Sequence, residues 1–264
     1  MTNIKVVTLN LWDVDESRDR RDGLLISGLN HLQPDIVCLQ EVSRVPDTHQ
    51  IHSELFAAPC GLTHHLFSGF GESQARESDL PGNVEGLSIL SRFPPVRQAS
   101  VALPYFAGDV PRQIFLAELS IGRSRIAVAT THLAFPPKFS RERELQAREA
   151  LDAVDLFTAK ADIDAIVLAG DFNEEAGAPA VHAVLESRYG FLDAYSVCRP
   201  DDPGATFTSA NPYVGPGYAP GQRIDFIFAA GKLEPVECNL VFDGTGGLGF
   251  VSDHLGVLCV FALK

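Results

Sequence analysis

The sequence has no long apolar run and no basic segment ahead of one. The first residues, MTNIKVVTLN, begin a strand-like pattern almost at once. No run approaches the roughly 20 apolar residues that a membrane-spanning helix needs. We therefore expect a soluble, cytoplasmic protein without a signal peptide or a transmembrane segment, unless a leader has been removed.

Basic residues are scarce. The chain has 21 Lys and Arg against 34 Asp and Glu, which gives a formal net charge of −13. An acidic chain gains little from the release of counterions that drives non-specific binding to nucleic acids. The charge therefore disfavours a nucleic-acid-binding protein, although a local basic groove is compatible with an acidic total.

Cysteines are few and have no metal-binding spacing. There are five, an odd number, and no C-x-x-C pair occurs. Cys38 and Cys259 lie within apolar runs, which is typical of small core residues. We expect their thiols to be reduced, as in a cytosol.

Apolar, β-branched runs are abundant. With 264 residues and 45% hydrophobic content, the chain can bury one large core, so we expect a single domain over residues 1–264. Loops rich in Gly and Pro occupy residues 69–86, 199–222 and 243–249, but none divides the chain. Eight runs have the length and composition of strands: IKVVTL, DIVCLQ, GLSIL, QIFLAEL, RIAVATT, DAIVLA, RIDFIF and GVLCVFAL.

A strand–helix–strand pattern occurs twice. Leucines at helical spacing follow the first strand, with Ser17 placed to cap the helix. An apolar stripe from Ala147 to Phe157 follows the fifth, with Ser140 as the expected cap. If the strands within each unit are parallel, their carboxyl ends meet at one edge, where open α/β sheets bind ligands.

The strands of both units end in polar residues. The first unit ends in Asn10 and Glu41, and the second in His132 and in Asp171 with Asn173. Any one of these residues could simply terminate its strand. All of them together favour a functional site.

Further along the chain, Asp225 and the pair Asp253–His254 add carboxylates and a second histidine. Hard oxygen ligands suit Mg²⁺. Glu41 is the first choice of metal ligand, with Asn10 and Asp253 beside it; a salt bridge from Glu41 to Arg44 is the alternative.

Two roles remain beside metal binding, namely activating a water and stabilising the leaving group. A histidine that acts as a base needs a partner to fix its tautomer, and Asp225 is a suitable partner for His254. Asp171 could orient or deprotonate the water, and Asn173 could donate to a phosphoryl oxygen. A hydrogen-bonded structural role is the alternative for His254.

Seven short motifs occur in the order typical of one family: TLNLW, LQEV, EGLSILSR, TTHL, GDFN, RIDFIF and SDH. From end to end the chain resembles the endonuclease/exonuclease/phosphatase superfamily. The resemblance implies an α/β fold, a four-layer α/β sandwich in which two mixed β-sheets pack face to face with helices outside. It also implies metal-dependent cleavage of a phosphoester.

The resemblance also implies roles for the residues. Glu41 binds Mg²⁺ with the help of Asn10 and Asp253, and Mn²⁺ or Ca²⁺ are possible substitutes. His254, paired with Asp225, is the base or a phosphate clamp, while Asp171 and Asn173 position the nucleophile and the phosphate. His132 contacts the scissile phosphate or the leaving group. Arg112 matches a basic phosphate contact of many members, and a surface arginine is the alternative.

The motif around Asn10 bears on the substrate. Nucleases of the family that cut at abasic sites carry an acid two residues after this asparagine, where this chain has Trp12. N-x-W followed later by THL looks more like the neutral sphingomyelinase branch. Residues 134–139 and 211–220 supply aromatic, Pro-rich surface for a lipid, or are ordinary stiff loops.

We therefore predict a Mg²⁺-dependent phosphodiesterase that acts as a monomer, with a lipid head group or a small phosphodiester as the favoured substrate. The alternatives are an endonuclease or exonuclease on DNA or RNA, and a phosphatase on a small phosphomonoester.

Other classes fit less well. GTGGLG precedes a strand instead of opening a helix, so it does not predict a dinucleotide site. No G-x-S-x-G motif indicates a serine hydrolase. A zinc hydrolase using His132 and His254 lacks the usual H-E-x-x-H spacing, and a non-catalytic relative would require a broken set of site residues.

Overall fold

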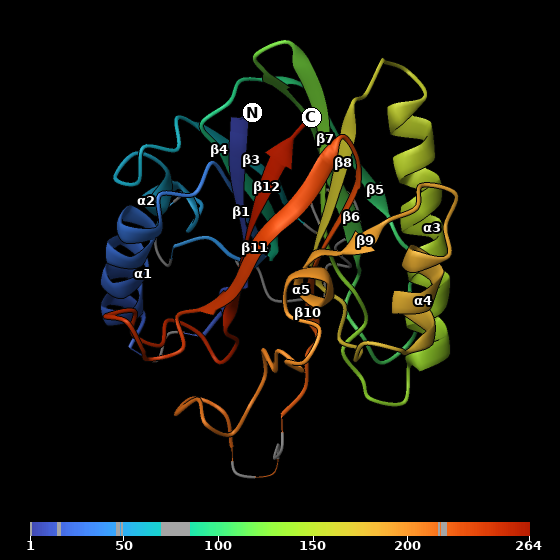
Figure 1. Ribbon diagram of the computed structural model, residues 1–264. Helices are drawn as coiled ribbons and strands as arrows, with labels where there is room; N and C mark the ends of the chain where they lie inside the picture. The colour runs from blue at the N-terminus through green and yellow to red at the C-terminus, as the bar shows by residue number, and fades with distance from the viewer. Residues whose placement is uncertain are drawn as a thin grey trace.

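Two six-stranded sheets pack face to face in the computed structural model (Figure 1). The structure describes residues 2–264 except 15–16, 46–47, 49, 70–84, 216 and 218–220. Most of the predicted loop at 69–86 therefore lies outside the described residues. The strand order of the first sheet is β11 (Leu233–Val241), β12 (Gly256–Leu263), β1 (Thr2–Asn10), β2 (Ile36–Val42), β4 (Gly86–Ser91) and β3 (His64–Gly69).

The second sheet has the same number of strands. Its order is β5 (Pro95–Ala102), β6 (Gln113–Ile121), β7 (Ser124–His132), β8 (Ala165–Asp171), β10 (Asp225–Gly231) and β9 (Leu192–Asp193). Each sheet contains one parallel pair, β1 with β2 and β7 with β8, and its other paired strands are antiparallel. Both sheets are therefore mixed, and the predicted parallel units are confirmed.

Helices cover the outer face of each sheet (Figure 1). On the first sheet these are α1 (Arg18–Leu32) and α2 (Glu54–Ala57), and on the second they are α3 (Ser140–Thr158) and α4 (Pro179–Leu185). A short α5 (Ala194–Cys198) packs near β11. The predicted four-layer α/β sandwich is confirmed, whereas a single domain over residues 1–264 stays a prediction.

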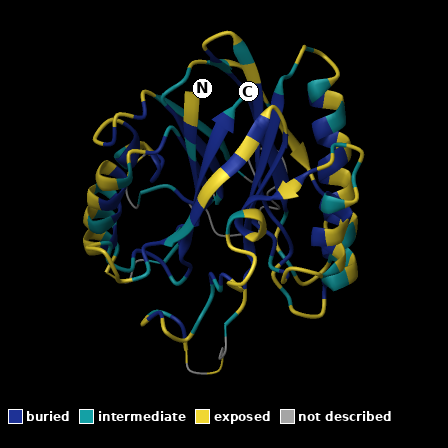
Figure 2. Ribbon diagram, in the orientation of Figure 1, coloured by how far each residue is buried: buried dark blue, intermediate teal, exposed yellow. Residues whose placement is uncertain are grey.

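The strand sequences explain the layers because side chains alternate between the two faces of a strand. In β1, Ile4 and Val6 point into the core between the sheets, while Val7 and Leu9 pack beneath α1 and α2. Figure 2 shows the strands mostly buried and the outer sides of the helices exposed. None of the helices in the described part of the chain combines the length and apolarity that a membrane span requires.

Neither predicted serine cap forms. Ser17 precedes α1 in a left-handed conformation and makes no side-chain capping bond. Ser140 lies inside α3, and the residue before that helix is Phe139. Capping serines need an extended backbone, so the conformations of the entering loops override this local signal.

The expectation of a reduced thiol is wrong for Cys259, whereas Cys38 is free. Cys238 of β11 and Cys259 of β12 are buried and joined by a disulfide. They face each other in the antiparallel register with their Cα atoms 4.2 Å apart. No apolar run marks β11, so this pairing was not predicted. Cys38, Cys60 and Cys198 are free.

A buried polar bridge joins the two sheets beneath their carboxyl edge. The side-chain amide of Gln40 in β2 donates to Thr8 Oγ1 in β1 at 3.1 Å and to Thr130 Oγ1 in β7 at 3.0 Å. All three side chains are fully buried. Each hydrogen bond satisfies a group that would be costly to bury alone, so the bridge fixes how the sheets lie on each other.

Glu118 in β6 is a fully buried carboxylate held between two arginines of neighbouring strands. Arg97 Nε donates to it at 2.5 Å, and Arg125 forms a second ion pair. Burial alone would raise the pKa of Glu118, but the hydrogen bonds from Arg125 and Arg97 outweigh it and hold that pKa below its ordinary value of 4.5.

We expect Glu118→Gln to lower the free energy of unfolding by about 1–3 kcal/mol at neutral pH, because two charge-assisted hydrogen bonds are lost. The depressed pKa stabilises the fold above the unfolded-state value, and this contribution disappears as the pH falls through the folded-state pKa. Urea unfolding from pH 7 down to about pH 3 should therefore show the difference from wild type shrinking. An equal cost at both ends would contradict this, and Glu234→Gln, at an exposed ion pair with Lys264, is the control.

Candidate active site

The predicted site residues meet at one edge of the sandwich because of strand register. His132 at the end of β7 lies beside Asp171 at the end of the parallel β8. Asp225 begins the antiparallel β10 and pairs with Asp171 from the other side. Asn10 ends β1, on the facing sheet. The predicted gathering of strand ends therefore occurs, and it spans both sheets.

Asp171 lies at the centre of this cluster and is 1% exposed. Its Oδ2 accepts a hydrogen bond from Asn10 Nδ2 at 3.0 Å. The same oxygen lies 3.5 Å from His132 Nε2 and 3.7 Å from His254 Nε2. Burial, and then the negative charge of Asp225, raise the pKa of Asp171 to about 7.

His254 and Asp225 form the predicted pair. His254 Nδ1 lies 2.8 Å from Asp225 Oδ2, and both side chains are buried. Burial alone would lower the pKa of His254, but the carboxylates of Asp225 and Asp171 outweigh it and raise that pKa well above 6.5. The imidazole is therefore held as a cation between two carboxylates.

Asp171, Asp225 and His254 offer ligand atoms within 4.8 Å of one another, close enough to hold a metal ion. In the structure these groups bond to one another and to their neighbours, since His254 Nδ1 pairs with Asp225 and Asp171 accepts from Asn10. The group is therefore a hydrogen-bonded network.

Glu41 in β2 and Asp253 in the loop before β12 fit a metal ion better than this group does. Glu41 Oε1 accepts from Asn10 Nδ2 at 2.9 Å, and Oε2 accepts from the Asp13 amide at 3.0 Å. Each carboxylate oxygen retains a further lone pair. Burial raises the pKa of Asp253 to about 6, and the charge of Glu41 acts in the same direction. Two hard oxygen donors that repel each other are a suitable setting for a divalent cation.

Asn10 and Glu41 are oriented by the local backbone. Asn10 turns its amide nitrogen toward the carboxylates, while its Oδ1 accepts from the Trp12 amide at 2.9 Å. The orientation makes Asn10 a donor to Glu41 and Asp171, whereas the sequence suggested a metal ligand. Glu41 has a φ of 51° where the pairing of β2 with β4 shifts register. Such a bulge re-aims a side chain, and strained backbone of this kind gathers at functional sites.

His132 faces a residue that the sequence analysis did not select. Its Nδ1 lies 3.9 Å from Glu85 Oε1 and has no hydrogen-bond partner among the described residues. Burial, and then Arg112 and His254, lower the pKa of His132 well below 6.5. Burial, and then the charge of Glu41, raise the pKa of Glu85 to about 7. Glu85 is the first letter of EGLSILSR, and its place inside a family motif was the available signal.

Arg112 lies close enough to influence both His132 and Glu85 electrostatically. It is 4% exposed, so the surface-arginine alternative is wrong. Its guanidinium pairs with Asp109 at 2.8 Å, and its Nη1 is buried with no hydrogen-bond partner in the described part of the chain.

Asn173 is fixed by its own turn. Its backbone amide donates to Asp171 Oδ1 at 2.8 Å, and its Nδ2 donates to the Leu133 carbonyl at 3.1 Å. One proton of the side-chain amide remains for another acceptor. The turn therefore ties GDFN to the segment that follows His132.

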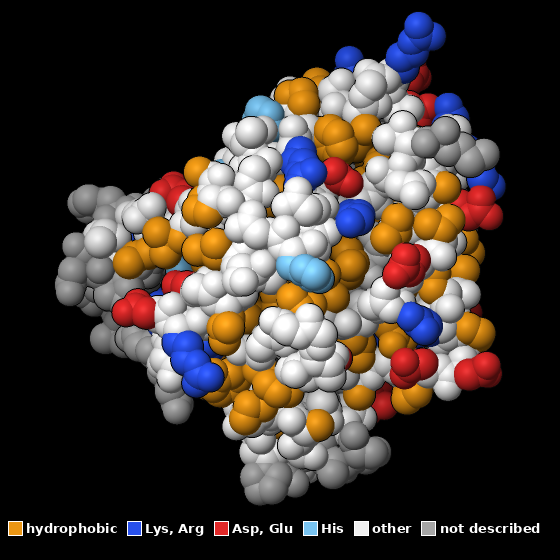
Figure 3. Space-filling model, turned by 60° about the vertical axis from the view of Figure 1, so that its left-hand side comes forward, with side chains coloured by type: hydrophobic (Ala, Val, Ile, Leu, Met, Phe, Trp, Pro, Cys, Tyr) orange, Lys and Arg blue, Asp and Glu red, His pale blue; other side chains and the backbone are white. Residues whose placement is uncertain are grey.

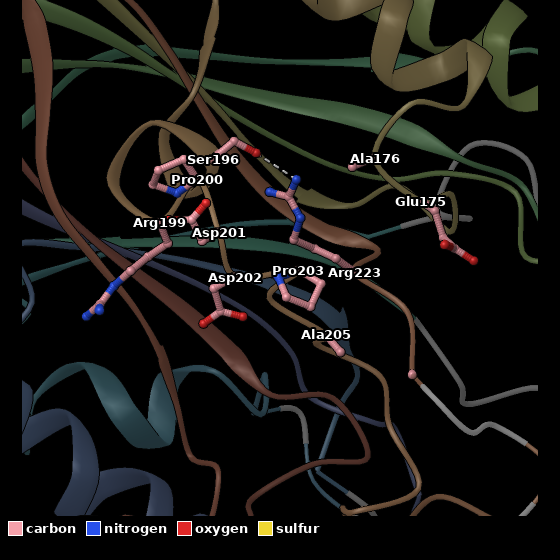
Figure 4. A pocket seen from close by; sticks show the side chains of 11 residues that line it. Glu175, Ala176, Ser196, Arg199, Pro200, Asp201, Asp202, Pro203, Ala205 and Arg223 are labelled. Carbon is pink, nitrogen blue, oxygen red and sulfur yellow. Dashed lines mark hydrogen bonds between the residues drawn. The ribbon is translucent and has the colours of Figure 1, made fainter.

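A cavity of about 570 Å³ is lined by other residues than those of the cluster around Asp171 (Figure 4). It is lined by Arg223, two positions before Asp225, and by Glu175, two positions after Asn173. Arg223 is already paired with Asp193, and Asp202 accepts from the Tyr195 hydroxyl. Arg223 and Asp202 are thus already engaged by neighbouring side chains.

A sequence model of the endonuclease/exonuclease/phosphatase family matches residues 7–254. The chain belongs to this family. Members of the endonuclease/exonuclease/phosphatase family are phosphoric ester hydrolases that depend on a divalent metal, and the chain is such an enzyme. Comparison with curated protein sequences gives no match.

Solved structures of the family share the fold. A family member from Beutenbergia cavernae is 26% identical, with a TM-score of 0.75 over 100% of this chain and 72% of its own. The human Nocturnin catalytic domain with bound sulfate is 20% identical, with a TM-score of 0.74 over 99% of this chain and 94% of its own. D. rerio TDP2 complexed with a single-strand DNA product is also 20% identical, with a TM-score of 0.73 over 99% of this chain and 100% of its own. At 20% identity these last two similarities concern the fold.

The backbone at position 170, the first residue of GDFN, requires glycine. It has a φ of 144°, and a Cβ at this position would lie 2.0 Å from the Thr131 carbonyl oxygen.

We expect Gly170→Ala to lower the free energy of unfolding by more than about 1 kcal/mol and to displace Asp171, with loss of activity. Gly23→Ala, in α1 with open space around it, should leave stability equal or higher. Thermal unfolding and activity of both variants test this, and a stable, active Gly170→Ala protein would contradict it.

Proposed function

We propose that this chain is a Mg²⁺-dependent phosphodiesterase that acts as a monomer and as a single catalytic domain over residues 1–264. The observation that carries the proposal is the buried Asp171 carboxylate. It contacts Asn10 on the metal side and lies within 3.7 Å of both His132 and His254. The cytoplasmic location expected from the sequence stays a prediction.

Glu41 and Asp253 would hold the cation, and Asn10 would orient Glu41. A divalent cation held by these residues would supply Lewis acidity for a phosphoryl oxygen. The identity of the ion as Mg²⁺ is supported by the donor set of carboxylate oxygens without cysteine, and Mn²⁺ or Ca²⁺ are the expected substitutes.

Asp171 and His254 have different roles at the phosphate. A carboxylate with its pKa near 7 is well matched to take a proton from an attacking water at neutral pH. Asp225 fixes Nδ1 of His254, so the protonated Nε2 can donate to a phosphoryl oxygen as charge develops. These assignments favour His254 as a phosphate clamp over His254 as the base.

On the opposite side, His132 and Arg112 are placed for the leaving group and a phosphate oxygen. His132 Nδ1 faces Glu85 at 3.9 Å and has no hydrogen-bond partner among the described residues. Arg112 Nη1 likewise has none in the part of the chain that the structure describes. Asn173 contributes its remaining amide proton to the phosphate.

The substrate we favour is a lipid head group or a small phosphodiester. The net charge of −13 opposes a long polyanion, and the face in Figure 3 shows basic and acidic side chains interspersed. The second candidate is a nucleic acid, which is favoured by the fold shared with a TDP2 complexed with single-strand DNA. A small phosphomonoester is the third, and the similarity to neutral sphingomyelinases stays a prediction.

The first test compares bis(p-nitrophenyl) phosphate with p-nitrophenyl phosphate, with Mg²⁺ and with EDTA. We expect hydrolysis of the diester only with Mg²⁺, and little hydrolysis of the monoester. Values of kcat/KM on sphingomyelin and on single-stranded DNA then rank the substrates. Cleavage of the monoester alone would identify a phosphatase and end the phosphodiesterase proposal.

The second test separates the two sides of the site. We expect His254→Asn to lower kcat by about 10²–10⁴-fold, because a proton-handling group is lost, with metal affinity close to wild type. Glu41→Gln should instead weaken Mn²⁺ binding, measured by the EPR signal of free Mn²⁺. Glu234→Gln, on an exposed part of β11, is the control for both. Unchanged Mn²⁺ affinity in Glu41→Gln would remove Glu41 from the metal site.

A further inference from the structure

We infer that Arg21 and Arg143 are a matched pair of positioning residues, one for each half of the active site. Arg21 fixes the loop beside the metal-side residues, and Arg143 fixes the loop beside His132 and Asn173. The inference deepens the proposed function and rests on it for the assignment of the two sides. Neither arginine belongs to a motif that the sequence analysis selected.

Arg21 is 3% exposed and binds backbone carbonyl groups from two separate loops. Its Nη1 donates to Leu11 at 2.9 Å and to Val251 at 3.1 Å. Its Nη2 donates to Trp12 at 3.3 Å and to Val14 at 2.6 Å. One guanidinium thus joins the loop after β1 to the loop that leads to Asp253.

Arg143 is 4% exposed, measured on its side chain, and does the same on the other sheet. Its Nη1 donates to the carbonyl groups of Ala134 and Pro136, both at 2.9 Å. Its Nη2 donates to Pro137 at 3.3 Å and pairs with Glu174 at 3.0 Å. This guanidinium joins the loop after β7 to the residue that follows GDFN.

The two arginines hold equivalent positions. Each is the fourth residue of the helix that follows a strand, in α1 and in α3. Arg21 lies eleven positions after Asn10, and Arg143 lies eleven positions after His132. The two helices cover opposite outer faces of the sandwich (Figure 1).

The two strands that lead to the site also carry equivalent threonines. Thr8 lies two positions before Asn10, and Thr130 lies two positions before His132. Gln40 donates to both threonines. Each strand end is therefore held by a threonine on its own strand and by an arginine from the next helix. The two strand–helix–strand units therefore share these contacts although their amino-acid sequences do not match.

The chemistry requires arginine. A guanidinium offers five N–H donors in a rigid plane, so it can bind several carbonyl groups of two loops at once. A lysine ammonium is a compact donor group on a flexible stem and cannot keep the same four contacts in one geometry. Lys variants therefore keep the charge and remove the positioning.

Loss of Arg21 and loss of Arg143 should have different effects on the enzyme. The Arg21 loop carries the Trp12 amide that orients Asn10 and the Asp13 amide that binds Glu41. The Arg143 loop carries the Leu133 carbonyl that holds Asn173. Loss of Arg21 should weaken metal binding, while loss of Arg143 should slow the reaction with the metal bound.

The experiment uses Arg21→Lys and Arg143→Lys, with Arg20→Lys and Arg141→Lys as matched controls on the exposed faces of the same helices. We expect Arg21→Lys to raise the dissociation constant of Mn²⁺, measured by EPR on the protein without substrate, by about 10–100-fold. We expect Arg143→Lys to lower kcat for the diester by about 10–100-fold with Mn²⁺ affinity and KM close to wild type. Both controls should behave as wild type.

Hydrogen exchange distinguishes positioning from a general loss of stability. We expect faster exchange in residues 11–14 and 250–253 of Arg21→Lys and in residues 133–139 and 172–174 of Arg143→Lys, with the core strands unchanged. Equal loss of metal affinity and kcat in both variants, faster exchange throughout the core, or wild-type behaviour would each overturn the inference. A wild-type protein that neither binds Mn²⁺ nor cleaves a diester would instead overturn the proposed function, and exchange would still test the two arginines.

Discussion

The site depends on keeping an ionisable carboxylate, Asp171, buried between two sheets. Such a group is costly to bury unless hydrogen bonds and nearby cations compensate it. No single strand can supply them all. Asn10 comes from the facing sheet, His132 from the neighbouring parallel strand, and His254 from a loop held beside the antiparallel β10. The requirement therefore couples the packing of the sheets to the geometry of the site.

The supports around this carboxylate are rigid backbone features. The pairing of β8 with β7 and β10 sets His132 and Asp225 on either side of Asp171. The bulge at Glu41 turns the metal-side carboxylate toward Asn10. Because each of these relations follows from register, a shift of one residue in any of the strands would move a whole set of side chains to the wrong face.

The layers and most of the site could be predicted from the sequence because apolar runs mark strands and polar residues end them. Each of the eight predicted runs coincides with a strand, and three of them begin one or two residues before it. β5 and β11 escaped detection because they are edge strands with alternating polar residues, and β11 contains Pro235. Glu85, Gln40 and the two arginines were missed for another reason. Glu85 and Gln40 lie inside the motifs EGLSILSR and LQEV, but their roles, like those of the two arginines, depend on contacts across the fold that the neighbouring residues in the chain do not indicate.

The bridge made by Gln40 has a consequence for how such an enzyme changes its chemistry. The two halves share one support below the strand ends, yet the residues on top differ, an amide with a carboxylate in one half and a histidine with a carboxylate in the other. A substitution above Thr130 changes the strand end that carries His132, while Thr8 still supports the strand end that carries Asn10. The fold thus presents two strand ends with different side chains on one shared support, and the hydrogen bond from Asn10 to Asp171 is the contact through which a change in one half reaches the other.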